Sequence, residues 1–465
     1  MPNTFRAANF VSGEFIPPRE GKYFDHLNPS TGLTSCEVPD SDLLDLVKAI
    51  QSANKASATW IKLTANERGE FLNKIADAVE RDADLLSRVQ ARDIGTPVRY
   101  AKSISIPATI RRFRDAASTI ESETNDRHPL GVVSVVTTWS DCFDTLAQRV
   151  APALALGNVV IAKPSEYSPE CAHHFARIMS EAGLPPGVFN LVQGRGAVVG
   201  EAIAQHPGLH HIAFCGSTET GQKFMSEAAE PLKRLHLAMG SKNPVLVFPG
   251  VDLKATAQIV ARITAGCHPA QCLRGSRLFL QDGIFKEFLA LLEDEFKSMK
   301  QGDPLDPETE IGPLISEHTR QLYRDAVSQA LGEKGKSSGS AVITAAEGFF
   351  VNPALISDLT YCSTLQQTEV MGPLVTATSF KYQYDAVKYA NVNPFGHTGF
   401  VFEADAEKAR KVGAKLETGQ TFLNLRNLPS YTFNTGLKAS GLGQSVKVLG
   451  SFFSHPINVV DTYEY

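Results

Sequence analysis

Hydrophobic side chains recur at helical spacing in two segments near the amino terminus. Residues 43–50 carry Leu, Val and Ile in this pattern directly after Asp40 and Ser41, and residues 71–79 repeat it with Phe, Leu, Ile, Ala and Val. This spacing places the apolar side chains on one face of an α-helix. Because Asp and Ser satisfy the N–H groups at a helix start, we expect Asp40–Ser41 to cap the first helix.

The pattern changes after Gly131. Residues 132–136 form a short β-branched run, and residues 159–162 form another, each predicting a buried strand. A helix over residues 171–182 and a strand over residues 188–192 follow. Strands that alternate with helices predict an α/β fold with a doubly wound parallel sheet.

A second α/β set starts near residues 244–248 and runs past residues 401–402. Residues 332–340, rich in Gly, Lys and Ser, predict an exposed loop between elements. The stretch 452–460 is apolar enough for an edge strand that pairs with another subunit. The chain therefore predicts two α/β domains and no internal repeat.

The composition narrows the possible partners. The 465-residue chain is 43% hydrophobic and 20% charged, with a net charge of −5. This is typical of a soluble globular protein, and the charge provides no attraction for nucleic acid or an anionic membrane. No apolar run approaches the roughly 18 residues that span a bilayer. We expect a small-molecule substrate, with neither a nucleic-acid nor a membrane partner.

The cysteines indicate the compartment. Seven cysteines are scattered along the chain, and residues 1–10 lack the apolar core of a secretory signal. Free thiols in the cytoplasm are therefore expected. Cys267, His268 and Cys272 lie close in sequence, but zinc would need a further ligand that the sequence does not supply, so no metal is expected.

Two Gly-rich loops follow predicted strands. Residues 194–200 contain three glycines before a helix, and residues 214–221 repeat the arrangement. Such loops let the backbone approach a phosphate at a helix amino terminus. Either loop alone is equally well explained as a simple turn, or in the second case as a Ser-Thr helix cap. Together they favour a dinucleotide site.

Three further side chains carry candidate chemistry. Lys163 and Glu166 end a strand, where ligands bind in doubly wound sheets, and can hold ribose hydroxyls; a surface ion pair is the alternative. Cys272 is a candidate nucleophile, with Arg274 and Arg277 nearby to lower its thiol pKa. A lone cysteine is more often a small buried hydrophobe, so only the surrounding motifs favour catalysis.

Together these segments resemble the aldehyde dehydrogenase superfamily from about residue 10 to residue 460. The matching segments are residues 157–166 (Gly-Asn-Val-Val-Ile-Ala-Lys-Pro-Ser-Glu), 214–221, 272–277, 369–373 (Glu-Val-Met-Gly-Pro, against Glu-x-Phe-Gly-Pro) and 438–443 (Lys-Ala-Ser-Gly-Leu-Gly, against Lys-x-Ser-Gly-x-Gly). Residues 106–113 and the chain after Asn424 are more weakly similar to 2-hydroxymuconate and 2-aminomuconate semialdehyde dehydrogenases.

The resemblance implies a three-part fold and a homodimer or homotetramer. A dinucleotide-binding domain would span residues 1–110 and 130–238, a catalytic domain 239–440, and a bridging oligomerisation element 111–129 and 441–465. Cys272 would attack an aldehyde, hydride would pass to NAD, and the thioester would be hydrolysed. Glu166 would favour NAD over NADP. The implied cofactor positions are Trp139, Lys163, Ser165, Glu166, Gly196, Gly200, Phe214, Gly216, Ser217, Glu369 and Met371.

Several catalytic positions depart from the family pattern. Ser140 replaces the Asn that donates to the oxyanion, and Ala238 replaces the Glu that acts as the general base. Residues 269–270 read Pro-Ala instead of Gly-Gln, 443–445 read Gly-Gln-Ser instead of Gly-Arg-Glu, and 434–436 read Asn-Thr-Gly instead of Phe-Gly-Gly. Losing one oxyanion donor costs about 10²–10³ in rate, and losing a general base costs roughly 10²–10⁴ more.

Three alternatives remain open from the sequence. The first is an NAD-dependent aldehyde dehydrogenase with altered machinery, in which the Ser140 hydroxyl donates to the oxyanion and His268 supplies a base. The second is a coenzyme A-acylating enzyme, because acylating relatives also lack the Glu and have Asn-Met-Gly-Ala-Lys against residues 238–242. The third is a non-catalytic protein that binds dinucleotide. Cys272 argues against the third.

Overall fold

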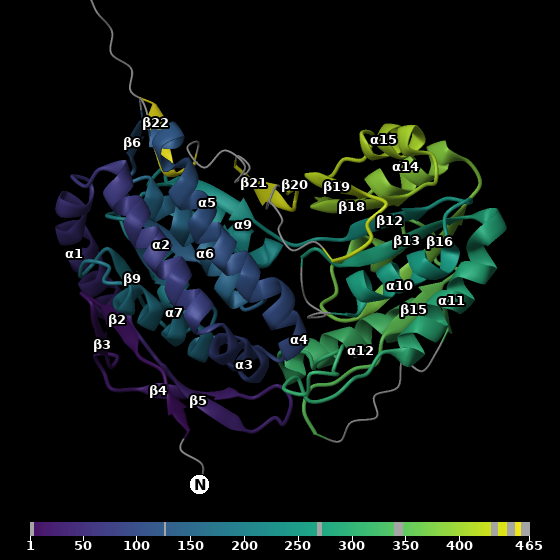
Figure 1. Ribbon diagram of the computed structural model, residues 1–465. Helices are drawn as coiled ribbons and strands as arrows, with labels where there is room; N and C mark the ends of the chain where they lie inside the picture. Colours follow the sequence, from purple (N-terminus) through teal and green to yellow (C-terminus); the bar gives the residue numbers. More distant parts are fainter. Residues whose placement is uncertain are drawn as a thin grey trace, which may run out of the picture.

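The structure is a computed structural model that describes residues 4–124, 127–266, 272–338, 347–428, 436–443 and 452–456. Two large sheets form the centres of two lobes that lie side by side, each with helices packed on its faces (Figure 1). The α/β fold with two doubly wound domains and a small bridging element is confirmed.

The first sheet has the strand order β21-β11-β10-β7-β8-β9-β2-β3. Neighbouring strands from β11 to β9 run parallel, whereas β21, β2 and β3 pair antiparallel. Its strands are β2 (Asn9–Val11), β3 (Glu14–Ile16), β7 (Val132–Val136), β8 (Val159–Lys163), β9 (Phe189–Leu191), β10 (His211–Cys215), β11 (Arg234–Ala238) and β21 (Gly441–Leu442). The chain winds outward from β7 to β9 and then returns to the other side of β7 at β10. Ligands bind beside the carboxyl ends of strands at such a switch point.

Helices cover both faces of this sheet, with α2, α5 and α6 prominent in Figure 1. They are α1 (Leu43–Trp60), α2 (Ala65–Arg81), α3 (Ala83–Ile94), α4 (Val98–Tyr100), the π-helical turn η1 (Ala101–Ser105), α5 (Ile106–Thr124), α6 (Cys142–Ala155), α7 (Pro169–Glu181), the π-helical turn η2 (Gly196–Gly200), α8 (Glu201–Gln205) and α9 (Thr218–Ala229). The predicted cap of α1 is wrong by one residue, because Asp42 accepts from the N–H groups of Leu44 and Asp45.

The second sheet has the order β14-β15-β16-β13-β12-β18-β19, parallel from β15 to β19. Its strands are β12 (Asn243–Val247), β13 (Gly275–Gln281), β14 (Lys336–Ser338), β15 (Ala354–Ser357), β16 (Leu374–Phe380), β18 (Thr398–Phe402) and β19 (Gln420–Leu423). Its helices are α10 (Leu253–Thr264), the 3₁₀ turn η3 (Asp282–Ile284), α11 (Phe285–Ser298), α12 (Glu317–Gly332), α13 (Thr364–Gln367), α14 (Gln383–Asn391) and α15 (Ala406–Gly413).

The loop predicted over residues 332–340 is partly wrong. Gly332 ends α12, and Lys336–Ser338 form β14, which pairs antiparallel with β15. Polar composition hid this strand because an edge strand exposes one side and is commonly lysine-bearing. Residues 339–340 lie outside the described residues.

Smaller strand pairs complete the fold. They are β1 (Phe5–Arg6), β4 (Tyr23–Leu27) and β5 (Thr34–Pro39) in one sheet, β17 (Phe395–Gly396) with β20 (Leu437–Lys438), and β6 (Arg127–Pro129) with β22 (Ser454–Pro456). The predicted edge strand at 452–460 thus pairs with β6 of its own chain over three residues. Residues 457–460 lie outside the described part, and pairing with another subunit stays a prediction, as do the domain bounds.

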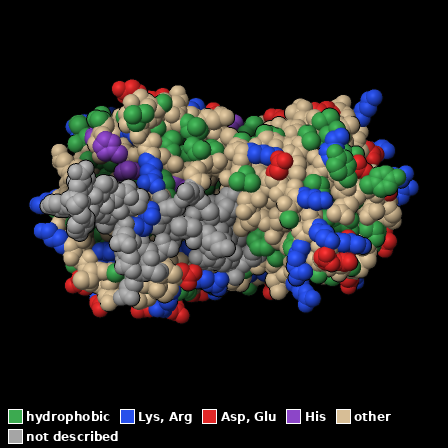
Figure 2. Space-filling model, turned by 90° about the horizontal axis from the view of Figure 1, so that it is seen from above, with side chains coloured by type: hydrophobic (Ala, Val, Ile, Leu, Met, Phe, Trp, Pro, Cys, Tyr) green, Lys and Arg blue, Asp and Glu red, His purple; other side chains and the backbone are tan. Residues whose placement is uncertain are grey.

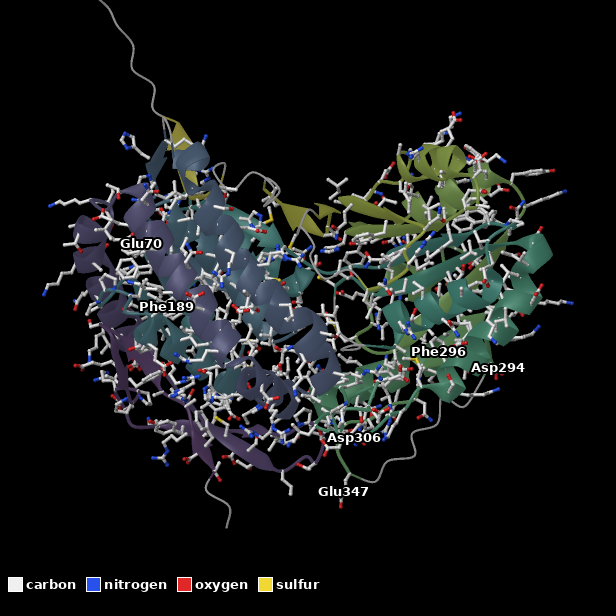
Figure 3. All side chains as sticks on the ribbon, in the orientation of Figure 1. Glu70, Phe189, Asp294, Phe296, Asp306 and Glu347 are labelled. Atoms are coloured by element: carbon white, nitrogen blue, oxygen red, sulfur yellow. The ribbon has the colours of Figure 1, made fainter. Side chains whose placement is uncertain are left out.

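Each lobe has its own hydrophobic core. Phe189 on β9 lies in the first core and Phe296 on α11 in the second, whereas Glu70 and Asp294 are exposed (Figure 3). On the face shown in Figure 2, Lys and Arg side chains are interspersed with Asp and Glu outside the grey region. None of the helices in the described ranges is both long and apolar enough to cross a membrane.

Candidate active site

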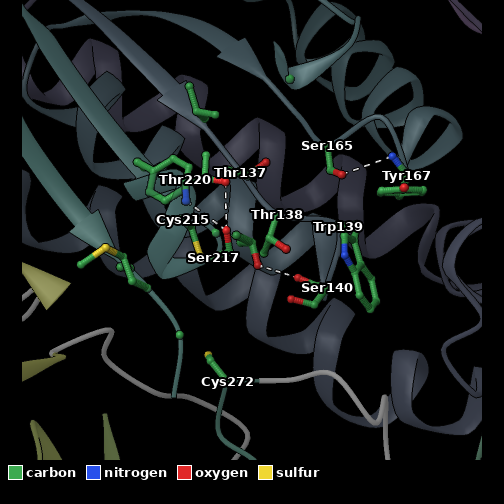
Figure 4. A pocket seen from close by; sticks show the side chains of 18 of the residues that line it. Thr137, Thr138, Trp139, Ser140, Ser165, Tyr167, Cys215, Ser217, Thr220 and Cys272 are labelled. Carbon is green, nitrogen blue, oxygen red and sulfur yellow. Dashed lines mark hydrogen bonds between the residues drawn. The ribbon is translucent and has the colours of Figure 1, made fainter. Parts of the chain in front are cut away.

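A cavity of about 680 Å³ opens at the carboxyl ends of β7, β8, β10 and β11, and Cys272 lies across it from these strands (Figure 4). It lies at the switch point of the first sheet. The cavity is lined by fourteen of the positions predicted for catalysis or cofactor binding: Trp139, Ser140, Lys163, Ser165, Glu166, Gly196, Gly200, Phe214, Gly216, Ser217, Ala238, Cys272, Glu369 and Met371. Those of the first lobe lie together because the carboxyl ends of its parallel strands share one edge of the sheet, whereas Cys272, Glu369 and Met371 come from the second lobe.

Glu166 is held from two sides. Lys163 Nζ donates to Oε2 at 3.1 Å, and the backbone N–H of Gly196 donates to Oε1 at 3.1 Å. Burial acts to raise the pKa of Glu166, but Lys163 and the N–H groups outweigh it, so this pKa lies below its usual value. Burial lowers the pKa of Lys163 in turn, against the attraction of Glu166. The pair therefore presents a carboxylate and an ammonium to the cavity at one point.

The second Gly-rich loop forms the start of α9. The Ser217 hydroxyl accepts from the N–H of Thr220 at 3.2 Å, so the predicted cap is present in addition to a place in the cavity wall (Figure 4). An added Cβ at Gly216 would lie 2.5 Å from the Phe214 ring, so this position requires glycine. The helix amino terminus that this loop forms favours an anionic group.

The Cys272 thiol is half-buried in the cavity wall, and its backbone carbonyl accepts from Asn243 Nδ2 at 2.7 Å. Burial raises the pKa of this thiol to about 12; Glu369 and Asp141 act in the same direction, and Arg149 opposes them. The resting group is therefore a thiol at neutral pH.

The predicted effect of Arg274 and Arg277 on Cys272 is wrong. The Arg277 guanidinium is buried and donates to the carbonyls of Lys242, Tyr389 and Ala390. Arg274 donates to the Val370 carbonyl. Both guanidinium groups bind backbone of their own domain, whereas the cation that acts on the thiol is Arg149 of α6. The distance along the sequence from Cys272 could not show which arginine acts on its thiol.

Glu369 reaches the cavity from the second lobe. Its Oε1 accepts from the N–H of Ser241 at 2.8 Å, and a Cβ at Gly240 would collide with its carboxylate. Burial raises the pKa of Glu369, although this N–H bond acts in the opposite direction. The glycine therefore makes room for the carboxylate beside the end of β11.

Two catalytic positions of the family are chemically weakened here. Ala238 ends β11, is 4% exposed and carries only a methyl group. Ser140 also lines the cavity, and its backbone carbonyl accepts from the Thr145 hydroxyl at 3.0 Å (Figure 4). A methyl group cannot accept a proton. Hydrolysis of the thioester therefore needs another base to activate water, unless the acyl group is transferred to a molecule other than water.

Sequence reasoning missed one wall of the cavity. Its residues come from α4, η1, α5 and the start of α6: Tyr100, Ile104, Ala108, Asp141, Asp144, Thr145 and Gln148. Cys215 at the end of β10 was also missed. One available signal was the spacing of Asp141, Asp144, Thr145 and Gln148, which places them on one helix face directly after Ser140.

Several predicted positions lie outside the described residues. They are Cys267, His268, Pro269 and Ala270 before the nucleophile, Asn434 and Thr435, and Gln444 and Ser445. The roles suggested for them, including a base at His268, stay predictions.

Comparison with known proteins agrees with this architecture. A model of the aldehyde dehydrogenase family matches residues 15–454. The 2-aminomuconic semialdehyde dehydrogenase of Danio rerio is 31% identical over 462 residues, covering 94% of this chain and 94% of that protein. Retinal dehydrogenase 2 of Homo sapiens is 33% identical over 460 residues, covering 95% and 89%.

Solved structures extend the similarity to the fold. An aldehyde dehydrogenase from Pseudomonas aeruginosa superposes with a TM-score of 0.93 at 29% identity, covering 97% of this chain and 96% of that one. The NAD⁺ complex of an aldehyde dehydrogenase from Bacillus cereus gives 0.93 at 27% identity, covering 97% and 95%. The chain belongs to the aldehyde dehydrogenase family.

Proposed function

We propose that this chain oxidises a small aldehyde to a carboxylic acid with NAD, through a thioester on Cys272. The observation that carries the proposal is a single cavity that holds Cys272 together with the Lys163–Glu166 pair and both Gly-rich loops. A nucleophile beside a phosphate-type site is what hydride transfer from a covalent adduct requires.

The residues present fit NAD. The start of α9 offers a helix amino terminus to a phosphate. Glu166, fixed by Lys163 and Gly196, offers a carboxylate to ribose hydroxyls, and its charge disfavours a 2′-phosphate. The NAD⁺ complex of the Bacillus cereus relative supports the same choice. When bound, NAD supplies the hydride acceptor.

The protein's own steps centre on Cys272. Its sulfur, once deprotonated, adds to the carbonyl carbon, and the carbonyl electron pair moves to oxygen. The Cys272 N–H and the Ser140 hydroxyl are the donors proposed for that oxyanion. Loss of hydride from the same carbon leaves the thioester, and water then replaces sulfur to release the acid. The sulfur releases its proton to solvent before the attack, and the departing sulfur recovers a proton from solvent or a nearby acid.

Two alternatives are each favoured by a specific observation. Ala238 in place of a base favours release of the acyl group to the thiol of coenzyme A. Ser140 and Ala238, in place of the family's oxyanion donor and general base, favour a non-catalytic protein that binds dinucleotide. A homodimer or homotetramer in the cytoplasm remains our proposal for the assembly and the compartment.

The test is a rapid-mixing measurement of NADH formation with purified enzyme, NAD and a panel of aldehydes. A burst approaching one NADH per chain in the native protein, absent in Cys272→Ala, supports the proposal. Faster turnover with coenzyme A present, together with an acyl-coenzyme A product, supports the acylating alternative. Measurable NAD binding without any burst supports the non-catalytic alternative.

A further inference from the structure

The cavity wall formed by α4, η1, α5 and the start of α6 contains a carboxylate that the family mechanism does not use. Asp141 follows Trp139 and Ser140 at the end of β7 and begins α6. Its backbone is left-handed, with φ of 53°, and its side chain makes no cap bond to the helix that it precedes. An ordinary role as a helix cap therefore does not explain this aspartate.

The Asp141 carboxylate is held by neighbouring elements. Its Oδ1 accepts from the hydroxyl of Ser105 on η1 and from Nε2 of Gln90 on α3, the latter at 3.3 Å. Ser105 and Gln90 are themselves fully buried. The Ser105 Oγ also lies 3.0 Å from Gln90 Oε1. Both donors are neutral, so they orient the carboxylate without adding a formal charge.

The neighbouring carboxylate is arranged differently. Asp144, one turn later on α6, forms a two-pronged ion pair with Arg112 of α5, with distances of 2.9 and 3.3 Å. Its charge is matched by this buried guanidinium. Of the two aspartates in the cavity wall, Asp144 is bound by a guanidinium, whereas Asp141 is bound by the side chains of Ser105 and Gln90.

We propose that Asp141 is the general base of thioester hydrolysis, acting from the α6 wall of the cavity in place of the side chain that Ala238 lacks. This inference rests on the proposed function. Asp141 and Cys272 line the same cavity, and the field of the carboxylate reaches the thiol. The step balances: water oxygen bonds to the thioester carbon, Asp141 takes the water proton, the C–S bond breaks, and the departing sulfur receives that proton from Asp141.

The electrostatics suit this task. Burial and the charge of Asp144 raise the pKa of Asp141 to about 7, while Ser105, Gln90 and Arg112 act in the opposite direction. Besides Asp141, the charged groups that act on the Cys272 thiol are Glu369, which raises its pKa, and Arg149 of α6, which lowers it. A base is most effective when its pKa is close to the working pH. Since the carboxylate form increases with pH, acyl release should rise through about pH 7 and then level off.

The experiment separates acylation from release without needing NAD. p-Nitrophenyl acetate acylates a reactive cysteine with a burst of nitrophenolate, after which steady turnover reports hydrolysis of the acyl-enzyme. In Asp141→Asn we expect the burst to persist, steady turnover to fall by about 100-fold, and the inflection near pH 7 to disappear. Asp252→Asn, at the helix cap of α10 and outside the cavity wall, is the matched control.

Intact mass measurement supplies the second readout: after p-nitrophenyl acetate is removed, acetyl-enzyme should decay about 100-fold more slowly in Asp141→Asn than in the native protein. Steady turnover within threefold of native in Asp141→Asn would overturn the proposal. So would loss of the burst together with turnover, since that places Asp141 in an earlier step or in the fold. If this ester assay succeeds and aldehydes give no NADH, the proposed function fails and the role of Asp141 stands.

Discussion

Lys163 Nζ lies 3.1 Å from Glu166 Oε2, at the point where β8 leaves the sheet. The two side chains are three residues apart, and the N–H of Gly196 holds the other carboxylate oxygen. The pair is therefore positioned by the first Gly-rich loop and not only by its own turn. This relationship joins two motifs that lie about thirty residues apart in the chain.

Replacement of Lys163 tests this arrangement. We expect Lys163→Met to weaken NAD binding by about ten- to a hundredfold, equivalent to roughly 1.4–2.8 kcal/mol. The variant removes one donor and leaves the Glu166 charge unpaired. Titration calorimetry with NAD measures the effect. Lys411→Met, which breaks an exposed ion pair with Glu407 on α15, is the control. Equal affinity for NAD in the native protein and both variants would contradict the role of Lys163 in binding NAD.

Restoring a carboxylate at Ala238 tests whether slow release limits turnover. We expect Ala238→Glu to raise the steady rate of aldehyde oxidation by at least about tenfold, because a general base contributes roughly 10²–10⁴ in rate. The burst of NADH should keep its amplitude. Ala238→Gln has nearly the same shape without basicity and should not be faster than native. Equal rates for the Glu and Gln variants would rule out this explanation.

The Cys272 thiol should react more slowly than an exposed cysteine at neutral pH. Burial raises its pKa to about 12, so little thiolate is present there. We expect its alkylation by iodoacetamide to accelerate about tenfold per pH unit between about pH 7 and 10. Peptide mass spectrometry follows the reaction, with exposed Cys362 as the internal reference. A plateau for Cys272 below about pH 8 would show that a cation lowers its pKa instead.

A buried pair that does not line the cavity contributes to the response of stability to pH. His26 Nε2 lies 2.9 Å from the Asp93 carbonyl oxygen and 3.2 Å from Asp93 Oδ1. Burial acts to lower the pKa of His26, but the contacts with Asp93 outweigh it and raise the pKa. The stabilisation from the charged ring is complete below the unfolded pKa of about 6.5 and is lost as pH rises through the higher folded pKa.

His26→Gln should therefore lower the free energy of unfolding by about 3–5 kcal/mol in mild acid, because Asp93 loses its charged partner. The difference from native should shrink as pH rises above the folded pKa. Denaturant unfolding over a pH series measures both quantities. His318→Gln, on the exposed face of α12, is the control. A difference that grows with pH would show that His26 is neutral in the fold.

Much of the cofactor half of the site could be predicted because strand ends are visible in the sequence. The β-branched runs at Val132–Val136 and Val159–Lys163 indicate neighbouring parallel strands, and the residues just after them must share one sheet edge. The strand end led to the expectation for Lys163 and Glu166, whereas Trp139 was expected only from the family resemblance; all three line the cavity. The cap of α1 and the strand β14 were missed, because the first depends on which acidic side chain reaches two backbone N–H groups and the second on pairing with β15.

The sequence by itself determined the family, the two α/β domains and the identity of the nucleophile candidate, because periodicity and ordered motifs are local properties of the chain. Only the tertiary structure decided the electrostatics around Cys272. Arg274 and Arg277, close in sequence, bind backbone carbonyls, whereas Arg149 and Asp141 of another element act on the thiol. Charge interactions depend on distance through space and on burial, and folding sets both.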